Sequence, residues 1–276
     1  MKSFRNLVLL ALCTCGDNFQ QQSEIRQVRV LGVRATPAEW VLSAGSTVPP
    51  PPVKFDALAV SPDDRSVTFT FAVCRGGNPF SAAFQCPGAD GLSLEGGVLA
   101  PTSASPLSGL PQSAAVNIGY LATDGTGADG GSERGIYAFS IRQADGNVSS
   151  DVPNSNPQLA EIVAQTDGGA DAPKSLARST WPLDTELIFT PQLVPGSIET
   201  YSTPSGVRTE QILYSWYSKG DDGGVEDLHS SEPLEGIGEK TSRYKTPKVS
   251  ADVTIYTVVR DNRGGTNWTE SHFGVR

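Results

Sequence analysis

Alternating hydrophobic and polar residues run through much of the chain and predict β-strands. In the clearest run, 67–74, one face carries Val67, Phe69, Phe71 and Val73. The same period of two runs through 136–141, 212–217 and 253–260. No stretch of the sequence carries a period of 3.6 over several turns, so the pattern predicts an all-β fold.

Turn-forming residues separate further short strands, which we expect at 28–33, 53–57, 186–189 and in a last segment with Trp268 and 273–275. The proline run 49–52 cannot donate ladder hydrogen bonds, so it predicts a stiff connector or a sheet edge. Small and polar residues fill 91–135 and predict a long loop with a short strand around 116–121.

The strands fall into two groups, separated by a polar connection at 147–179 within which 158–163 opens the second group. Several short strands with one tryptophan, Trp216, on a middle strand are typical of an immunoglobulin-like sandwich. We therefore expect two tandem immunoglobulin-like β-sandwich domains, residues 28–150 and residues 151–276.

The second domain also resembles the PKD-type sandwich family, over roughly the last 90 residues of the chain. Tyr214-Ser215-Trp216 followed by Gly220-Asp221 is similar to that family's aromatic, tryptophan and Gly-Asp turn motif, with the turn displaced. The alternating strand 253–259, followed by Asp261-Asn262 and Gly264-Gly265, is similar to the family's closing strand.

The first residues predict export and lipidation. Lys2 and Arg5 precede a short apolar run, 7–12, which is too short for a membrane-spanning helix of about 20 residues. A cysteine directly after such a run resembles the lipobox of bacterial lipoproteins, in which the cysteine is acylated and becomes the first residue. The alternative is an ordinary secretory signal.

Cysteine parity favours Cys15 over Cys13 as the acylated residue. Cleavage before Cys15 removes residues 1–14 as the signal peptide and leaves Cys74 and Cys86 as one pair, whereas acylation of Cys13 leaves an odd thiol in an oxidising compartment. Residues 15–27 have no apolar period, and we expect them to form a flexible tether.

The net charge of the protein limits the kinds of partner that it can bind. The 276 residues carry a net charge of −9, and loss of Lys2 and Arg5 without any acidic residue makes the mature charge −11. An acidic body has nothing to neutralise nucleic-acid phosphates and is not attracted to an anionic membrane surface, so contact with the membrane is expected through the lipid. The 29 glycines and 20 prolines fit turns between short strands.

Two segments resemble uncharacterised lipoproteins of Gram-negative bacteria. These are Arg29-Val30-Leu31-Gly32-Val33-Arg34-Ala35, the first signature segment, and Val258-Val259-Arg260-Asp261-Asn262-Arg263-Gly264-Gly265, the second signature segment. The resemblance implies a lipid-anchored location in the cell envelope, which we expect to be the outer membrane, and it implies no activity.

Cys74 and Cys86 are separated by a turn-rich segment and predict a structural disulfide, worth about 3 kcal/mol in the chain-entropy model. Metal binding is the alternative, but the spacing is unusual for a zinc site and no histidine is near in sequence.

Calcium is the one cofactor with candidate ligands. Asp124 and Asp129 lie in one Gly-rich loop, and Asp221 and Asp222 lie in a second acidic loop. Neither loop has the Asp-x-Asp-x-Asp-Gly spacing of a calcium loop, so solvated acidic loops are the alternative, and no cofactor is expected.

No catalytic motif is found in the sequence. The two histidines, His229 and His272, lie outside any Gly-x-Ser-x-Gly nucleophile motif, so no residue is assigned a catalytic role and no enzyme is expected. Trp40, Trp181 and Trp268 are candidates for a carbohydrate-binding surface, although tryptophan on a sandwich is more often buried.

These patterns predict a non-enzymatic binding, scaffolding or spacer protein of the envelope. Its partner would be an unidentified envelope protein or a glycan. The alternatives are a carbohydrate-binding accessory module and a hydrolase with an unrecognised site.

Overall fold

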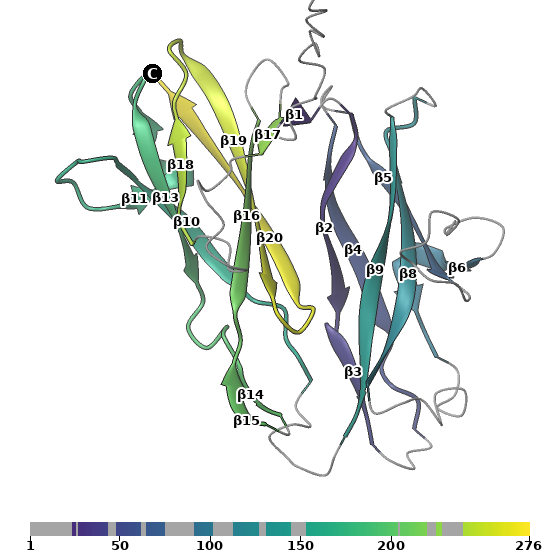
Figure 1. Cartoon of the computed structure of the whole chain (residues 1–276). Coiled ribbons are helices and arrows are strands. Elements are labelled where there is room, and N and C mark those ends of the chain that lie inside the picture. Colours follow the sequence, from purple (N-terminus) through teal and green to yellow (C-terminus); the bar gives the residue numbers. More distant parts are fainter. Residues whose placement is uncertain are drawn as a thin grey trace, which may run out of the picture.

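The fold comes from a computed structural model, which describes residues 24–25, 27–43, 48–61, 65–74, 91–101, 113–126, 131–144, 153–203, 205–219, 225–227 and 240–276. These residues form two β-sandwiches that lie side by side with their strands running roughly in the same direction (Figure 1). The all-β prediction is confirmed. Among the described residues, no helix is long and apolar enough to cross a membrane.

The first sandwich comprises strands β2 to β9. One sheet has the order β2 (Arg29–Thr36), β4 (Val53–Val60) and β7 (Val98–Leu99). The other has the order β3 (Glu39–Leu42), β9 (Ser132–Gln143), β8 (Ser113–Thr123), β5 (Thr68–Cys74) and β6 (Gly91–Leu94). A short 3-10 turn, η1 (Glu95–Gly97), joins β6 to β7.

The second sandwich comprises strands β10 to β20 together with β1. One sheet has the order β11 (Lys174–Ser175), β10 (Leu159–Thr166), β13 (Glu186–Leu193) and β18 (Ser242–Lys245). The six-stranded sheet has the order β1 (Glu24–Ile25), β17 (Val225–Asp227), β16 (Ile212–Lys219), β19 (Ala251–Asp261), β20 (Thr266–Val275) and β12 (Thr180–Trp181). A 3-10 turn, η3 (Leu176–Arg178), precedes β12, and a hairpin of β14 (Thr200–Thr203) and β15 (Gly206–Thr209) stands between β13 and β16.

Both sandwiches are built on the same strand order. In each, the opening segment contributes to the smaller sheet, β2 in the first sandwich and β10 with the short edge strand β11 in the second. A short strand then pairs in parallel with the last strand of the larger sheet: β3 with β9, and β12 with β20. The remaining pairs are antiparallel and follow the same sequence of neighbours, β9-β8-β5-β6 and β20-β19-β16-β17. This arrangement is immunoglobulin-like, as the strand spacing predicts.

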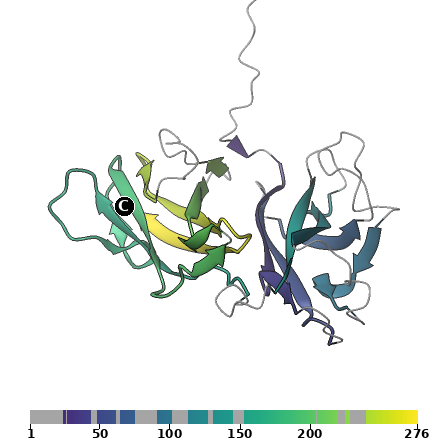
Figure 2. The ribbon, with the colours of Figure 1, turned by 60° about the horizontal axis from the view of Figure 1, so that its bottom comes forward.

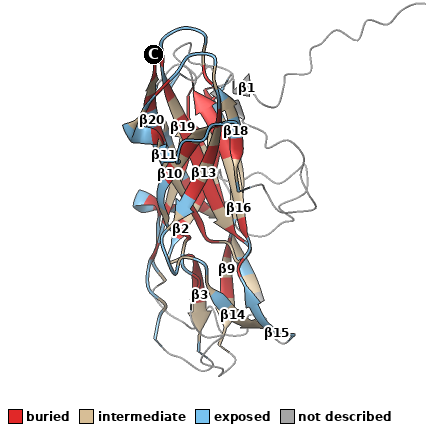
Figure 3. Cartoon of the chain, turned by 90° about the vertical axis from the view of Figure 1, so that its left-hand side faces the viewer, coloured by how far each residue is buried: buried red, intermediate tan, exposed pale blue. Residues whose placement is uncertain are grey.

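Each sandwich has its own core. The first core is aromatic, with Trp40 and Phe55 both edge-on to Phe139. In the second core, Phe189 packs against Trp216 and, edge-on, against Phe273. Figure 3 shows the buried residues following the strands along the length of the molecule. The faces predicted from alternation in 67–74 and 136–141 do point into the first core.

Two sequence expectations need correction. The loop predicted over 91–135 contains the 11-residue strand β8, longer than the expected strand at 116–121, because β8 pairs along its whole length with β9 and its small polar residues sit on a half-exposed face. The predicted tether 15–27 is not free to its end. Glu24 and Ile25 pair with Glu226 and Val225 at the edge of the six-stranded sheet.

Candidate functional site

The two signature segments meet at one surface between the sandwiches, which we call the domain interface. β2 carries the first segment and lies against β20, while the second segment ends β19 and forms the β19–β20 turn. The Arg260 guanidinium donates to the Leu31 carbonyl at 2.5 Å. Arg34 donates to the Asn267 side-chain oxygen at 2.7 Å and lies 4.4 Å from the ring centre of Trp268. Figure 2 shows β2 beside the second sandwich.

The centre of the domain interface is apolar. Its cluster takes side chains from both sandwiches: Leu31, Leu58, Val60, Tyr217, Tyr256 and Val258, with Trp268 at its margin. Gly32 sits where the strands approach closely, because a Cβ there would lie 3.2 Å from the Val258 side chain. The two sandwiches therefore share a third apolar cluster in addition to the core of each, and they are more than tethered neighbours.

Two asparagines of the segment that connects the sandwiches, Asn154 and Asn156, make hydrogen bonds at the polar edge of the domain interface. The Asn154 amide donates to both oxygens of Asp261, at 3.1 and 3.2 Å. Asp261 also accepts the backbone N–H groups of Arg263 and Gly265, at 2.8 Å each, which fixes the β19–β20 turn. The Asn156 side chain donates to the Ala35 carbonyl at 2.7 Å and accepts from the Thr266 N–H at 2.8 Å, so it bridges the sandwiches.

Arg263 is the centre of a largely buried charge cluster at the end of the interface. Its guanidinium lies 2.8 Å from Glu39 of the first sandwich, 3.1 Å from Glu199 and 3.3 Å from Glu210. The side chain of Arg263 is 11% exposed, that of Glu39 6% and that of Glu210 0%. Arg142 also pairs with Glu39, at 3.4 Å. The cluster ties the first sandwich to the base of the β14–β15 hairpin, where Glu199 and Glu210 exchange hydrogen bonds.

Burial at the domain interface perturbs several ionisable groups. Loss of solvent raises the pKa of Glu210, and the neighbouring carboxylates of Asp261 and Glu199 act in the same direction. Desolvation also raises the pKa of Tyr137 to about 12, and its hydroxyl donates to the Gly264 carbonyl at 2.9 Å. These shifts follow from closure of the interface and do not by themselves mark a reaction centre.

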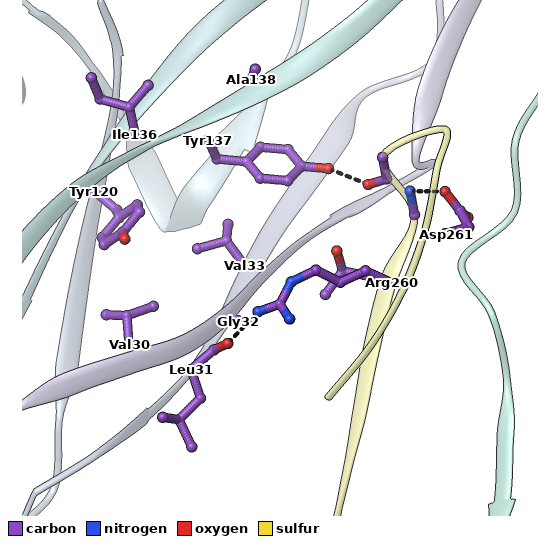
Figure 4. Close-up of a pocket in the computed structure, with 13 residues that line it drawn as sticks. Val30, Leu31, Gly32, Val33, Tyr120, Ile136, Tyr137, Ala138, Arg260 and Asp261 are labelled. Carbon is purple, nitrogen blue, oxygen red and sulfur yellow. Dashed lines mark hydrogen bonds between the residues drawn. The ribbon is translucent and has the colours of Figure 1, made fainter. Parts of the chain in front are cut away.

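A cavity of about 320 Å³ lies within the domain interface. Figure 4 shows Tyr120, Ile136, Tyr137 and Ala138 on the side of the first sandwich, residues 30–33 of β2 along the middle, and Arg260 with Asp261 from the second sandwich. Arg260 also donates to Ser215, so its guanidinium is already engaged by protein groups. A second cavity, of about 560 Å³, lies between the β2–β3 corner and residues 153–158. The second cavity is lined largely by polar residues, of which Arg34, Asn154 and Asn156 already hydrogen-bond to other protein groups.

Of the calcium candidates, only Asp124 falls within the described residues. Its oxygens accept the Thr126 N–H and hydroxyl at 3.0 and 2.7 Å and pair with Arg65 at 3.6 Å, and these hydrogen bonds hold the pKa of Asp124 below its usual value. Asp129, Asp221 and Asp222 lie outside the described residues. Among the described residues, no group of three or more His, Cys, Asp or Glu side chains could hold a metal ion.

Of the two histidines, His272 falls within the described residues. His272 lies on the exposed face of β20, its Nδ1 is 2.9 Å from the Thr254 hydroxyl, and its Nε2 is 3.7 Å from Glu270. The order Thr, His, Glu resembles a catalytic triad, but the His272 side chain is 69% exposed on an open sheet, and neither of the two cavities includes it. His229 lies outside the described residues.

The tryptophan candidates do not form an exposed platform. Trp40 and Trp181 are 3% and 5% exposed, as expected for tryptophan on a sandwich, so these two candidates do not line a carbohydrate surface. They lie inside because β3 and β12 close the two cores. Trp268 is half-buried under Arg34 at the domain interface. Trp216 is a core residue, as its strand position predicts.

Cys74 ends β5 with its side chain half-buried. Its predicted partner Cys86, and both lipidation candidates, Cys15 and Cys13, lie outside the described residues.

The residues that sequence reasoning missed are those of the charge cluster: Glu39, Arg142, Glu199, Glu210 and Arg263. The second signature segment already marked the turn that carries Arg263, but no local pattern identifies its partners. Those partners are far apart in the chain and meet only after both sandwiches have folded.

No protein-family profile and no curated protein sequence matches the chain. Among solved structures, the chain is similar to the tandem Ig repeats of Dlar, at 9% identity and a TM-score of 0.27, covering 91% of this chain and 98% of that one. It is similar to dimeric latent PorU from Porphyromonas gingivalis at 13% identity and a TM-score of 0.25, and to the protocadherin GammaB4 extracellular domain at 10% identity and a TM-score of 0.19. Each match covers 91% of this chain, but only 24% of PorU and 33% of the protocadherin. These likenesses are too distant to add to the strand order.

Proposed function

We propose that the protein is a lipid-anchored, non-enzymatic scaffold or spacer of the bacterial cell envelope, whose two sandwiches act as one rigid block. The observation that supports this most is the domain interface. It combines a shared apolar cluster, the asparagine bridges and the buried cluster of Arg263. Interfaces between independently moving domains are usually more polar and less continuous.

The signature segments give the proposal a physical basis. Of the first segment, Leu31, Gly32 and Arg34 face the second sandwich, and of the second, Val258, Arg260 and Arg263 face the first. The residues that suggested a resemblance to envelope lipoproteins are therefore residues that fix the angle between two domains. A fixed angle suits a protein that holds its partner at a set distance and orientation.

The anchor is proposed from the sequence of residues 1–15. Cys15 would carry the lipid, with Cys13 as the alternative, and the location would be the outer membrane of a Gram-negative bacterium. The partner would be an unidentified envelope protein. A glycan partner and a hydrolase remain alternatives, but among the described residues the tryptophans are buried or half-buried and His272 faces solvent. The PKD-type character of the second sandwich also belongs to the proposal.

A disulfide between Cys74 and Cys86 is part of the same proposal. It would close the segment between β5 and β6, which are antiparallel neighbours. Mass spectrometry of non-reduced protein should find the bridged peptide, and recovery of both thiols in reduced form from exported material would contradict it.

Metabolic labelling with an alkyne fatty acid tests the anchor. We expect labelling of the wild-type protein and of Cys13→Ala and complete loss in Cys15→Ala. Cys74→Ala is the matched control, because it removes a cysteine of the mature body and should keep the label. Labelling that persists in Cys15→Ala and disappears in Cys13→Ala would move the anchor, and no labelling of any form would reject it.

A further inference from the structure

The pairing of β1 with β17 fixes where the predicted tether meets the folded body. Ile25 is opposite Val225, Val225 is opposite Lys219, and Lys219 is opposite Thr254 of β19. Thr254 lies three residues from the start of β19 at Ala251, about 10 Å along the strand. The tether therefore joins the body at the end of the second sandwich where β18 turns into β19 (Figures 1 and 3).

That end carries two adjoining turns, which we call the anchor-side turns: residues 182–185 between β12 and β13, and residues 246–250 between β18 and β19. The Asp184 N–H donates to the Pro247 carbonyl at 3.0 Å, and the Thr246 hydroxyl donates to the Pro182 carbonyl at 2.7 Å. These bonds hold the turns side by side.

Exposed apolar and basic groups share the anchor-side turns. Val249 is 70% exposed and Leu183 39% exposed. Lys248 lies next to Val249 in the chain, and Lys245 pairs with Asp184 at 3.0 Å. Apolar side chains beside a lysine suit the boundary between lipid head groups and acyl chains, where the lysine meets phosphates, and the exposed Lys248 supplies this charge because Lys245 is paired.

We infer that the anchor-side turns rest on the surface of the bilayer that holds the lipid anchor, with the β14–β15 hairpin pointing away from it. This inference rests on the proposed acylation of Cys15. Eight residues lie between Cys15 and Glu24, so the connection is nine residue-to-residue steps long, about 30 Å when fully extended and about 17 Å for a flexible coil. A body on so short a connection cannot leave the membrane surface.

The length of the second sandwich sets its orientation. From Thr254 to the β19–β20 turn is seven residues, about 23 Å, and the four-residue strands of the hairpin add about 13 Å. The hairpin stands at that far end, where Asn262 donates to the Tyr201 hydroxyl at 3.2 Å and Arg263 reaches Glu199. The hairpin is thus farther from β1 than a flexible tether spans, so the opposite orientation is disfavoured.

Depth-dependent quenching of an added tryptophan tests the orientation. Val249→Trp places the probe on an anchor-side turn, and Val207→Trp places a probe of matched exposure, 72%, on the hairpin at the other end. Each full-length, acylated variant is reconstituted in phosphatidylethanolamine–phosphatidylglycerol vesicles with and without brominated phosphatidylcholine. Subtracting the emission of the acylated parent removes the contribution of the four native tryptophans.

We expect brominated lipid to reduce the added emission of Val249→Trp at least about twofold and to leave that of Val207→Trp unchanged. Equal quenching of the two, or stronger quenching of Val207→Trp, would overturn the orientation. Leu183→Trp gives a second probe on the same end if Val249→Trp fails to fold by its melting curve. Failure of the anchor itself is distinguishable, because the parent would then not float with the vesicles at all.

Discussion

The two sandwiches share one strand order but bury their larger sheets differently. In the first, the sheet β3-β9-β8-β5-β6 packs on the core with one face and leaves exposed positions on the other, such as Thr68, Thr70 and Ala115. In the second, the central strands β16 and β19 are buried on both faces, because β2 and β4 of the first sandwich cover the outer face.

The difference is visible in the pattern of hydrophobic residues along the strands. β19 carries buried residues at five consecutive positions, 255–259, of which Ile255 faces the inner core and Tyr256 and Val258 face the domain interface. A strand covered on both faces tends toward a continuous apolar run, whereas a half-buried strand alternates. β5 and β9 alternate, and they are half-exposed. The comparison shows that a strand with little alternation of hydrophobic and polar residues is one whose second face is also covered by packing.

The largest expected effect comes from removing one ring from each core. Phe139 in the first sandwich and Phe189 in the second are both 0% exposed, and truncation of such a residue to alanine costs about 3–5 kcal/mol. Because the domain interface joins the cores, Phe139→Ala and Phe189→Ala should each shift one common urea-unfolding transition, followed by tryptophan fluorescence.

The same pair of variants also tests whether the two sandwiches unfold together. Two separate transitions in the parent, of which each variant shifts only one, would mean that the sandwiches fold independently and that the interface adds little. A full-length protein of unaltered cysteine content should be used, so that any disulfide is the same in all samples.

Arginine replacement at the interface should have the next largest effect. Arg263→Ala leaves Glu39 and Glu210 buried without their main counter-charge. Loss of one partner of a buried ion pair costs about 3–5 kcal/mol of stability. This range is an upper bound for Arg263→Ala, because the third partner, Glu199, is 21% exposed. The free energy of unfolding in urea measures the loss.

Arg243 provides the matched control for Arg263. It also pairs with two carboxylates, Asp167 at 2.5 Å and Glu186 at 2.9 Å, but its side chain is 56% exposed. Solvent screens such a pair, so Arg243→Ala should hardly move the midpoint. Equal losses in the two variants would show that burial at the domain interface does not strengthen the cluster of Arg263.

The sequence is sufficient to predict the all-β class, the immunoglobulin-like sandwiches and much of each core, because alternation and turn residues are local signals. Phe69, Phe71 and Val73 share a buried face for this reason, and so do Tyr137, Phe139 and Ile141. The sequence predicts too short a strand for β8, because Asn117 and Gly119 weaken its apolar pattern and its register is set by its neighbours β5 and β9.

The domain interface could not be predicted in the same way. Both signature segments resemble known sequences, yet nothing local shows that Arg34 reaches Asn267, 233 residues away. Alternation places Tyr217 and Lys219 on the face of β16 opposite to that of Trp216, and they are buried because the first sandwich covers that face. Lys219 donates to the Ser61 carbonyl at 3.3 Å across the interface. Contacts of this kind depend on how two completed domains dock.

The smallest expected effect is on the pH dependence of stability, which should differ between Glu210 at the domain interface and Asp124 in the segment between β8 and β9. Burial raises the pKa of Glu210, so the folded protein binds this proton more tightly than the unfolded chain does. The stabilising contribution is therefore full below the unfolded pKa and is lost as pH rises through the folded value. Asp124, whose pKa is lowered chiefly by hydrogen bonds from Thr126, has the opposite sign: its contribution is present above its unfolded pKa and is lost as pH falls through the folded one.

Urea unfolding of Glu210→Gln and Asp124→Asn beside the wild-type protein, across the range from neutral to acidic pH, distinguishes the two regions. On acidification, wild type should gain stability relative to Glu210→Gln and lose it relative to Asp124→Asn. The amide replaces each carboxylate with little change in volume, so the pH-dependent part of the difference reports the proton alone. If Glu210→Gln instead follows the same trend as Asp124→Asn, Arg263 outweighs burial at Glu210. The interface would then be held by its charges more than by the exclusion of water.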